Sequence, residues 1–121
     1  MRILFVDDDD TRHDIAAKAF KAHEVWHARD IDVAIHMLAA REYDLVCIDH
    51  DMADDGRTGV DVATALVAQP WEPRFAWVHS WNPVGQQRIA DVLSGKVRHG
   101  IRAFSGDACV SVSQIVRGIE T

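Results

Sequence analysis

Three short apolar segments of this sequence each end in acidic or imidazole side chains, and these groups could do chemistry together. The residues that follow the segments are Asp7, Asp8, Asp49, His50, Asp51, His79, Ser80 and Asn82. Two carboxylates held about 4 Å apart repel each other by roughly 4 kcal/mol at an effective dielectric constant of about 20. If the side chains converge they therefore require a cation, a proton or open water, and a solvated loop is the alternative interpretation.

Two of the seven histidines stand at these segment ends, and they are the candidates for proton transfer. His50 and His79 each lie beside other reactive side chains, and imidazole titrates near neutral pH, so either could touch a substrate or a metal. The other histidines have no acidic or histidine partner at ligand spacing, which predicts ordinary surface or half-buried residues. These are His13, His23, His27, His36 and His99.

The stretch HSWNPVG suits a phosphate group as a ligand. Ser80 offers a hydroxyl group to a phosphate oxygen, although the same hydroxyl could satisfy the backbone at a strand end. Asn82 followed by Pro83 is typical of a helix start, the amides behind it form an anion site, and Gly85 removes bulk there. Arg12, one turn into an expected helix, is either a surface cation or a phosphate clamp.

The elements that position these residues alternate between apolar runs and amphipathic stretches. The apolar runs predict strands at 2–6, 24–28, 44–48, 74–78 and 100–104. Helical spacing predicts helices at 11–23 and 30–42, around VATALVA (62–68), from Pro83 onward, and at 112–119. The expected helix starts are Thr11 with Asp14, Asp30, and Thr58 with Asp61. This alternation implies a doubly wound α/β domain over 1–121, with ligands at the carboxyl ends of parallel strands.

Length, charge and cysteine content restrict the class of protein. At 121 residues and 48% hydrophobic residues, the chain fits one globular domain. The formal net charge of −6 argues against non-specific binding to DNA or to an anionic membrane, and no apolar run reaches the roughly 18 residues of a membrane span. Two cysteines without a CxxC motif cannot build a zinc site alone. With no signal-peptide pattern, we expect a cytoplasmic protein with reduced thiols.

The order of the blocks ILFVDDD, YDLVCID and WVHS resembles the receiver domains of bacterial response regulators across almost the whole chain. The resemblance implies a flavodoxin-like sheet of five parallel strands with helices on both faces. It also implies that Asp7, Asp8 and Asp49 bind a divalent cation, Mg²⁺ or Mn²⁺, which both prefer oxygen ligands. Asp49 matches the residue that accepts a phosphoryl group, and Ser80 matches the hydroxyl residue after the fourth strand.

One departure from that pattern points to a narrower family. Signalling receivers carry a lysine after the fifth strand, whereas IRAFSGDA (101–108) contains none, which argues against ordinary phosphorelay switching. A closer resemblance is to the cyclic-phosphate processing receiver domains, through the blocks DDDDTRHD, IDHDM, TGVDVA and VHSWNPVGQQRI. That family is proposed to act on cyclic phosphates or nucleic-acid ends.

The residues and the resemblance together favour a metal-dependent phosphoesterase that acts on a cyclic nucleotide or on the phosphate of an RNA end. In this hypothesis the catalytic residues are His50, His79, Asp49 and Asp51, the phosphate-binding residues are Ser80, Asn82, Gly85, Thr58 and Arg12, and the metal ligands are Asp7, Asp8 and Asp49. One alternative is an atypical receiver or pseudo-receiver signalling module that is phosphorylated at Asp49. The other is a non-catalytic binder of cyclic nucleotides or phosphate.

Overall fold

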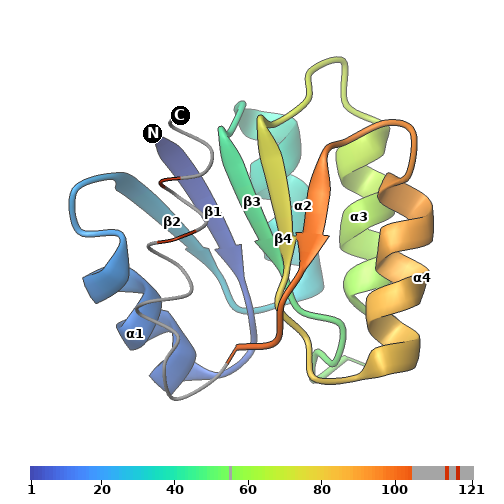
Figure 1. Ribbon diagram of the computed structural model, residues 1–121, viewed down its shortest axis with the longest axis horizontal. Helices are drawn as coiled ribbons and strands as arrows, with labels where there is room; N and C mark the ends of the chain where they lie inside the picture. The colour runs from blue at the N-terminus through green and yellow to red at the C-terminus, as the bar shows by residue number, and fades with distance from the viewer. Residues whose placement is uncertain (55, 105–113, 115–116, 118–121) are drawn as a thin grey trace.

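Five parallel strands form one sheet at the centre of the computed structural model, which describes residues 1–54, 56–104, 114 and 117. The strands are β1 (Arg2–Val6), β2 (Glu24–Ala28), β3 (Leu45–Ile48), β4 (Phe75–Val78) and β5 (His99–Ile101). Their order across the sheet is β2-β1-β3-β4-β5, and every neighbouring pair is parallel (Figure 1). The predicted five-stranded parallel sheet is confirmed.

The described helices cover both faces of this sheet. They are α1 (Asp10–Ala19), α2 (Ile31–Ala40), α3 (Gly59–Val67) and α4 (Pro83–Leu93). Helix α1 lies on one face, and α2, α3 and α4 lie on the other, which confirms the flavodoxin-like arrangement (Figure 1). The predicted helix at 112–119 lies outside the described residues except for 114 and 117. Among the described helices, none has the length and hydrophobicity that crossing a bilayer requires.

Polar caps start α2, α3 and α4 as the sequence predicts. The Asp30 carboxylate accepts the Val33 N–H at 2.8 Å, and Thr58 forms a capping box with the third helical residue of α3. The Asn82 side chain caps α4 at the Gly85 N–H, with a proline as the first helical residue. These caps fix where each helix begins at the carboxyl edge of the sheet.

The predicted bounds of the first helix are wrong at both ends. Helix α1 begins at Asp10, and Asp9 rather than Thr11 is its N-cap, because the Asp9 carboxylate already accepts the Arg12 N–H at 3.1 Å. The helix ends at Ala19, and the C-cap Phe20 leaves helical geometry with its side chain fully buried in the core. The chain then turns through residues 20–23 into β2.

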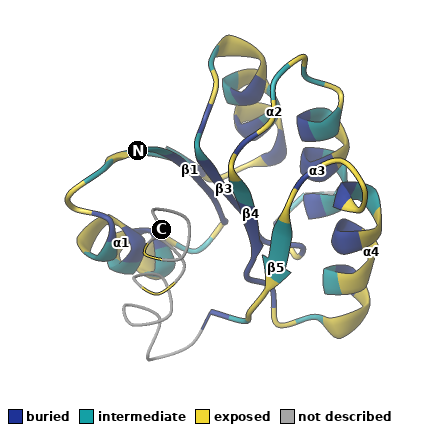
Figure 2. Cartoon of the chain, turned by 45° about the horizontal axis from the view of Figure 1, so that its top comes forward, coloured by how far each residue is buried: buried dark blue, intermediate teal, exposed yellow. Residues whose placement is uncertain are grey.

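The central strands are buried along most of their length (Figure 2). Their side chains alternate between two hydrophobic clusters, one on each face of the sheet. In β1, Ile3 and Phe5 pack toward α1, whereas Leu4 and Val6 pack toward the three helices of the other face. The odd-numbered residues of β3 and β4 also belong to the cluster on the α1 face. A side chain directly after the end of a strand therefore points to the face of the sheet that this alternation assigns to it.

The chain connections diverge between β1 and β3. From β1 the chain passes through α1 to the edge strand β2, whereas from β3 it passes through α3 to β4 on the other side. This divergence is the topological switch point, and in open α/β sheets ligands bind there, just beyond the carboxyl ends of the strands. The residues after Val6 and Ile48 lie at that position.

Candidate functional site

The ends of β1, β3 and β4 bring three titratable side chains together. Asp7, Asp49 and His79 each follow the last residue of their strand, and the three strands end in register. All three side chains are buried, and one ligand atom from each lies within 4.8 Å of the others. We call these residues the Asp7–Asp49–His79 row. It is the group of the described residues that has the donors and spacing for one metal ion.

The imidazole of His79 is fixed between aromatic rings and the carboxylate of Asp7. Its Nε2–H donates to Asp7 Oδ2 at 2.9 Å, because an ionised carboxylate can only accept. The ring stacks on Phe5 with centroids 4.8 Å apart, and the rings of Trp77 and Phe104 lie 5.1 and 5.9 Å away. The buried Nδ1 makes no hydrogen bond with the described residues. The row therefore has one rigid, fully buried member.

Arg12 reaches into the row from the first turn of α1. Its Nη1 lies 3.2 Å from Asp7 Oδ2 and 3.4 Å from Asp7 Oδ1, and it lies 3.6 Å from Asp49 Oδ2. The Arg12 side chain is 30% exposed, whereas the two carboxylates are almost completely buried. The positive charge that the two acids require is thus supplied by the chain itself in this structure.

The environment separates the pKa values of the two aspartates. Burial raises the pKa of Asp49 to about 6. The negative charge of Asp7 also raises it, whereas the charges of His79 and Arg12 lower it but do not outweigh burial. Burial also acts on Asp7, but the hydrogen bond and charge of His79, with the Asp9 N–H and Arg12, outweigh it and lower its pKa. As the pH falls, Asp49 is therefore the carboxylate that takes up a proton first, and Asp7 stays ionised to lower pH.

Asp8, which we expect as the third metal ligand, lies outside the row. Its side chain is exposed, and its Oδ2 accepts the N–H of Ala53 at 2.9 Å, which ties the end of β1 to the loop after β3. Consecutive residues at a strand end point in opposite directions, so Asp7 and Asp8 are separated by geometry. His79 takes the third position beside the two aspartates.

His50 belongs to a second cluster, on the other side of the end of β3. Its Nδ1 lies 2.8 Å from Asp51 Oδ1, and since the carboxylate accepts, Nδ1 carries the proton. The same Asp51 oxygen accepts from the Asn82 side-chain amide at 3.3 Å, and the hydrogen bond from His50 is the main cause of a lowered Asp51 pKa. A methyl group at Gly85 would overlap the His50 ring, so this glycine lets the imidazole lie against α4.

Each of the two candidate hydroxyl groups accepts a hydrogen bond from a backbone N–H group. Ser80 is 1% exposed and its Oγ accepts the Asn82 N–H at 3.1 Å, while Thr58 Oγ1 accepts the Val60 N–H at 3.1 Å. Each hydroxyl keeps its own proton for a second hydrogen bond. Gly59 follows Thr58, and a side chain there would overlap the carbonyl oxygen of Asp49, so α3 starts directly against the end of β3.

Two histidines that we expect to be without partners are in contact, so that prediction is wrong. His13 Nε2–H donates to the backbone oxygen of Asp7 at 2.7 Å, and His13 Nδ1 lies 2.7 Å from His27 Nδ1. Burial lowers the pKa of both imidazoles. Neutral His13 therefore accepts at Nδ1, and His27 donates its Nδ1–H. The missed signal is the strand order, which places His27 of β2 beside β1 and beneath α1.

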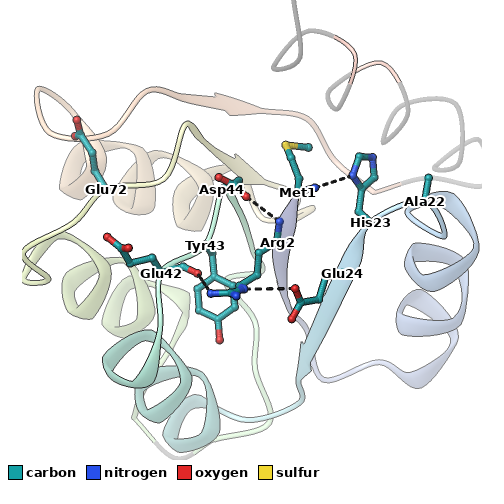
Figure 3. Close-up of a pocket in the computed structure, with 9 residues that line it drawn as sticks. All are labelled: Met1, Arg2, Ala22, His23, Glu24, Glu42, Tyr43, Asp44 and Glu72. Carbon is teal, nitrogen blue, oxygen red and sulfur yellow. Dashed lines mark hydrogen bonds and ion pairs between the residues drawn. The ribbon is translucent and has the colours of Figure 1, made fainter.

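A pocket of about 570 Å³ lies at the opposite end of the sheet, around the amino end of β1 (Figure 3). Arg2 crosses it, donating from Nη1 to the Glu42 backbone oxygen and from its backbone N–H to the Asp44 carboxylate. The carboxylate of Glu24 pairs with the same arginine at 3.6 Å. None of our candidate site residues lines this pocket.

Receiver domains are among the solved structures to which this chain is similar. A CheY-like receiver domain from Methanospirillum hungatei has a TM-score of 0.76 at 15% identity, covering 98% of this chain and 93% of its own. The response regulator TrrA of Thermotoga maritima, in complex with Mg²⁺ and BeF, has a TM-score of 0.74 at 18% identity, covering 98% and 97%. The Mn²⁺-bound response regulator Rcp1 has a TM-score of 0.71 at 18% identity, covering 94% and 90%. At these identities the likeness shows the fold.

The family comparison is more specific. No curated protein matches the chain in sequence. The family described as the cyclic-phosphate processing receiver domain matches residues 2–95, a span that contains the row, the His50 cluster and Arg12. The chain therefore belongs to the family of cyclic-phosphate processing receiver domains.

Proposed function

We propose that this domain is a metal-dependent phosphoesterase whose substrate carries a cyclic phosphate or a phosphate at the end of a nucleotide or RNA chain. The observation that carries the proposal is the buried Asp7–Asp49–His79 row at the carboxyl edge of the sheet. Two carboxylates in that position attract a cation, a place that Arg12 holds in this structure, and the family to which the chain belongs is described as cyclic-phosphate processing.

The donor set of the row fits a divalent cation. Carboxylate oxygens suit both Mg²⁺ and Mn²⁺, and the imidazole of His79 favours Mn²⁺ over Mg²⁺. Two of the similar structures hold these ions, one as a Mg²⁺ complex and one in a Mn²⁺-bound form, which supports the choice. When bound, such an ion would polarise a phosphoryl oxygen of the substrate.

His50 is the better candidate for proton transfer. Its Nδ1–H is held by Asp51, so the neutral ring presents Nε2 as a proton acceptor in a fixed orientation. His79 is fully buried and its Nε2–H donates to Asp7, so it cannot carry protons to a substrate, and it would bind a cation through Nε2 only after releasing that proton. We therefore assign His50 as the general acid or base, Asp51 as the residue that orients it, and His79 to the cation.

The phosphate group would be held from the α4 side and the α1 side. Helix α4 has eleven residues and presents its amino end behind Asn82, and a helix amino end favours an anion. Ser80 and Thr58 can each donate a hydroxyl proton, and Arg12 can donate from its guanidinium. Trp81 is 62% exposed beside these groups, and its indole offers a face for a nucleobase.

Hydrolysis assays on the purified protein test this proposal. With Mg²⁺ or Mn²⁺ present, we expect turnover of at least one of 2′,3′-cyclic nucleotides, 3′,5′-cyclic nucleotides, cyclic dinucleotides or RNA with a cyclic end. Asp49→Asn and His50→Gln should abolish it, whereas Asp91→Asn should not, because Asp91 is exposed and its carboxylate accepts a hydrogen bond from Gln87 of the same helix. The proposal fails if all these substrates remain intact.

A phosphoacceptor role for Asp49 is the second candidate. The residue directly follows β3 and lies next to Asp7, the position that the receiver likeness gives to the acceptor. Against this role, residues 102–104 after β5 contain Arg102 but no lysine, and the Arg102 guanidinium donates to Gln114 at 3.0 Å. Incubation with acetyl phosphate should yield an acid-labile phosphate, absent from Asp49→Asn, if this role is correct.

Binding without turnover is the remaining alternative. Isothermal titration against the same phosphates would then give saturable binding that Asp49→Asn and His79→Ala weaken, with no product detected in parallel reactions. Product formation by the same protein preparation would exclude this alternative.

A further inference from the structure

We propose that Arg12 is a resident counter-ion of the Asp7 and Asp49 carboxylates, that a divalent cation must displace it, and that the displaced guanidinium then binds the phosphate. This inference rests on the proposed function for the cation and the phosphate, and it adds the order and coupling of their binding. It makes the metal and the phosphate cooperative ligands of one site.

The distances place the guanidinium in the position of a cation. A single nitrogen, Arg12 Nη1, lies 3.2 and 3.4 Å from the two oxygens of Asp7 and 3.6 Å from Asp49 Oδ2. The same two carboxylates belong to the group that has metal-ligand spacing. A divalent cation binds carboxylate oxygens at about 2.0–2.6 Å, so it would occupy the space between these oxygens and Nη1 and repel the arginine. The two cations therefore exclude each other.

Of the two side chains that donate a hydrogen bond to Asp7, Arg12 is the one that can leave. His79 is fully buried and stacked on Phe5, so its ring has no open space into which to turn. The Arg12 side chain is 30% exposed, and its hydrogen bonds to the row all involve one terminal nitrogen at 3.2 Å or more. Its backbone N–H is held separately by Asp9, so the side chain can swing without disturbing α1.

The displaced guanidinium remains at the carboxyl edge of the sheet. Its helix starts directly after β1, so the freed group lies next to the cation and faces the anion that the cation attracts. Guanidinium groups bind phosphate through paired N–H donors. Each ligand then strengthens the binding of the other. The metal frees the arginine to bind phosphate, and a phosphate that binds the arginine keeps it out of the metal site. Thermodynamic linkage requires the two effects to be equal.

Metal titrations on variants of Arg12 test the competition without any assay of turnover. We expect Arg12→Gln to bind Mn²⁺ more tightly than the unmodified protein, by about fivefold or more, when free Mn²⁺ is followed by electron paramagnetic resonance. Arg12→Lys should fall between them. Arg74→Gln is the matched control and should not change the affinity, because Arg74 pairs with Asp44 at 3.8 Å at the amino edge of the sheet.

Phosphate titrations test the coupling. In the unmodified protein, saturating Mn²⁺ should tighten the binding of inorganic phosphate, and this gain should shrink in Arg12→Gln. Circular dichroism melts check that each variant is folded. If Arg12→Gln does not fold, the comparison is made with Arg12→Lys. Equal or weaker Mn²⁺ binding by the Arg12 variants would overturn the inference, even if the enzyme hydrolyses a cyclic phosphate. Tighter Mn²⁺ binding without any hydrolysis would support it while the phosphoesterase proposal fails.

Discussion

Replacing Asp49 by asparagine should stabilise the metal-free protein at neutral pH, although the residue is central to the proposed site. Burial raises the pKa of Asp49 from 3.8 to about 6, which corresponds to about 3 kcal/mol at roughly 1.4 kcal/mol for each unit of pKa. The ionised carboxylate destabilises the fold by that amount above pH 6. Asparagine has nearly the same shape and no charge, so we expect a gain of about 1–3 kcal/mol, which raises Tm by roughly 3–6 °C per kcal/mol.

The pH dependence distinguishes this electrostatic cause from a packing effect. The folded state keeps the Asp49 proton up to about pH 6, whereas the unfolded chain loses it near pH 3.8, so stability falls as pH rises through that interval. Urea unfolding in EDTA should therefore show a large advantage for Asp49→Asn at pH 7.5 and almost none at pH 4. A gain of equal size at both values, or a loss at pH 7.5, would refute the reasoning.

Asp7 supplies the matched control within the same row. Its pKa lies below the ordinary value despite burial, because the hydrogen bond and charge of His79 and the charge of Arg12 stabilise its ionised form. Asp7→Asn should consequently destabilise the protein at pH 7.5, and the difference should disappear as the pH falls through the lowered pKa. Two neighbouring carboxylates should thus give stability changes of opposite sign for the same substitution.

Substitutions at three further positions test the second cluster and its surroundings. Gly85→Ala places a methyl group in the His50 ring, so we expect a loss of about 1–3 kcal/mol in urea unfolding and a fall in kcat. Thr58→Ala removes the cap of α3 and should lower the free energy of unfolding by about 1 kcal/mol, whereas Thr58→Ser should restore it. Trp81→Ala should change stability by less than about 0.5 kcal/mol, since the indole is 62% exposed. It should weaken calorimetric binding of a cyclic nucleotide by about 1–3 kcal/mol and leave inorganic phosphate unaffected.

The row is the part of the site that sequence reasoning predicts best. Three apolar runs stop at residues 6, 48 and 78, the predicted ends, and parallel strands meet at one edge, so the following side chains must gather there. Alternation along each strand then selects Asp7 over Asp8, because only odd-numbered residues face α1. Applying that rule at every strand end would have put His79 in place of Asp8.

Contacts that depend on the strand order are not predictable from the local pattern. The pairing of His13 with His27 requires the edge strand β2 to lie beside β1 and α1 to cover both, and no spacing within the chain states this. The reach of Arg12 depends on the N-cap of α1 being Asp9, two residues earlier than the capping pattern at Thr11 suggests, because each residue turns a helix by about 100°. A cation on the wrong face of α1 would never meet the two carboxylates.

The end of β3 explains how one site could combine charge and proton transfer. Asp49 continues the face of the sheet that packs on α1, whereas His50, the next residue, points to α4 and is held there by Asp51 and by the absence of a side chain at Gly85. In the proposed reaction, a phosphate above this strand end has the carboxylates and Arg12 on one side and the imidazole on the other. A phosphorylation switch requires the first side alone. The His50 cluster is therefore the feature whose removal should abolish turnover while leaving Mn²⁺ binding to the row unchanged.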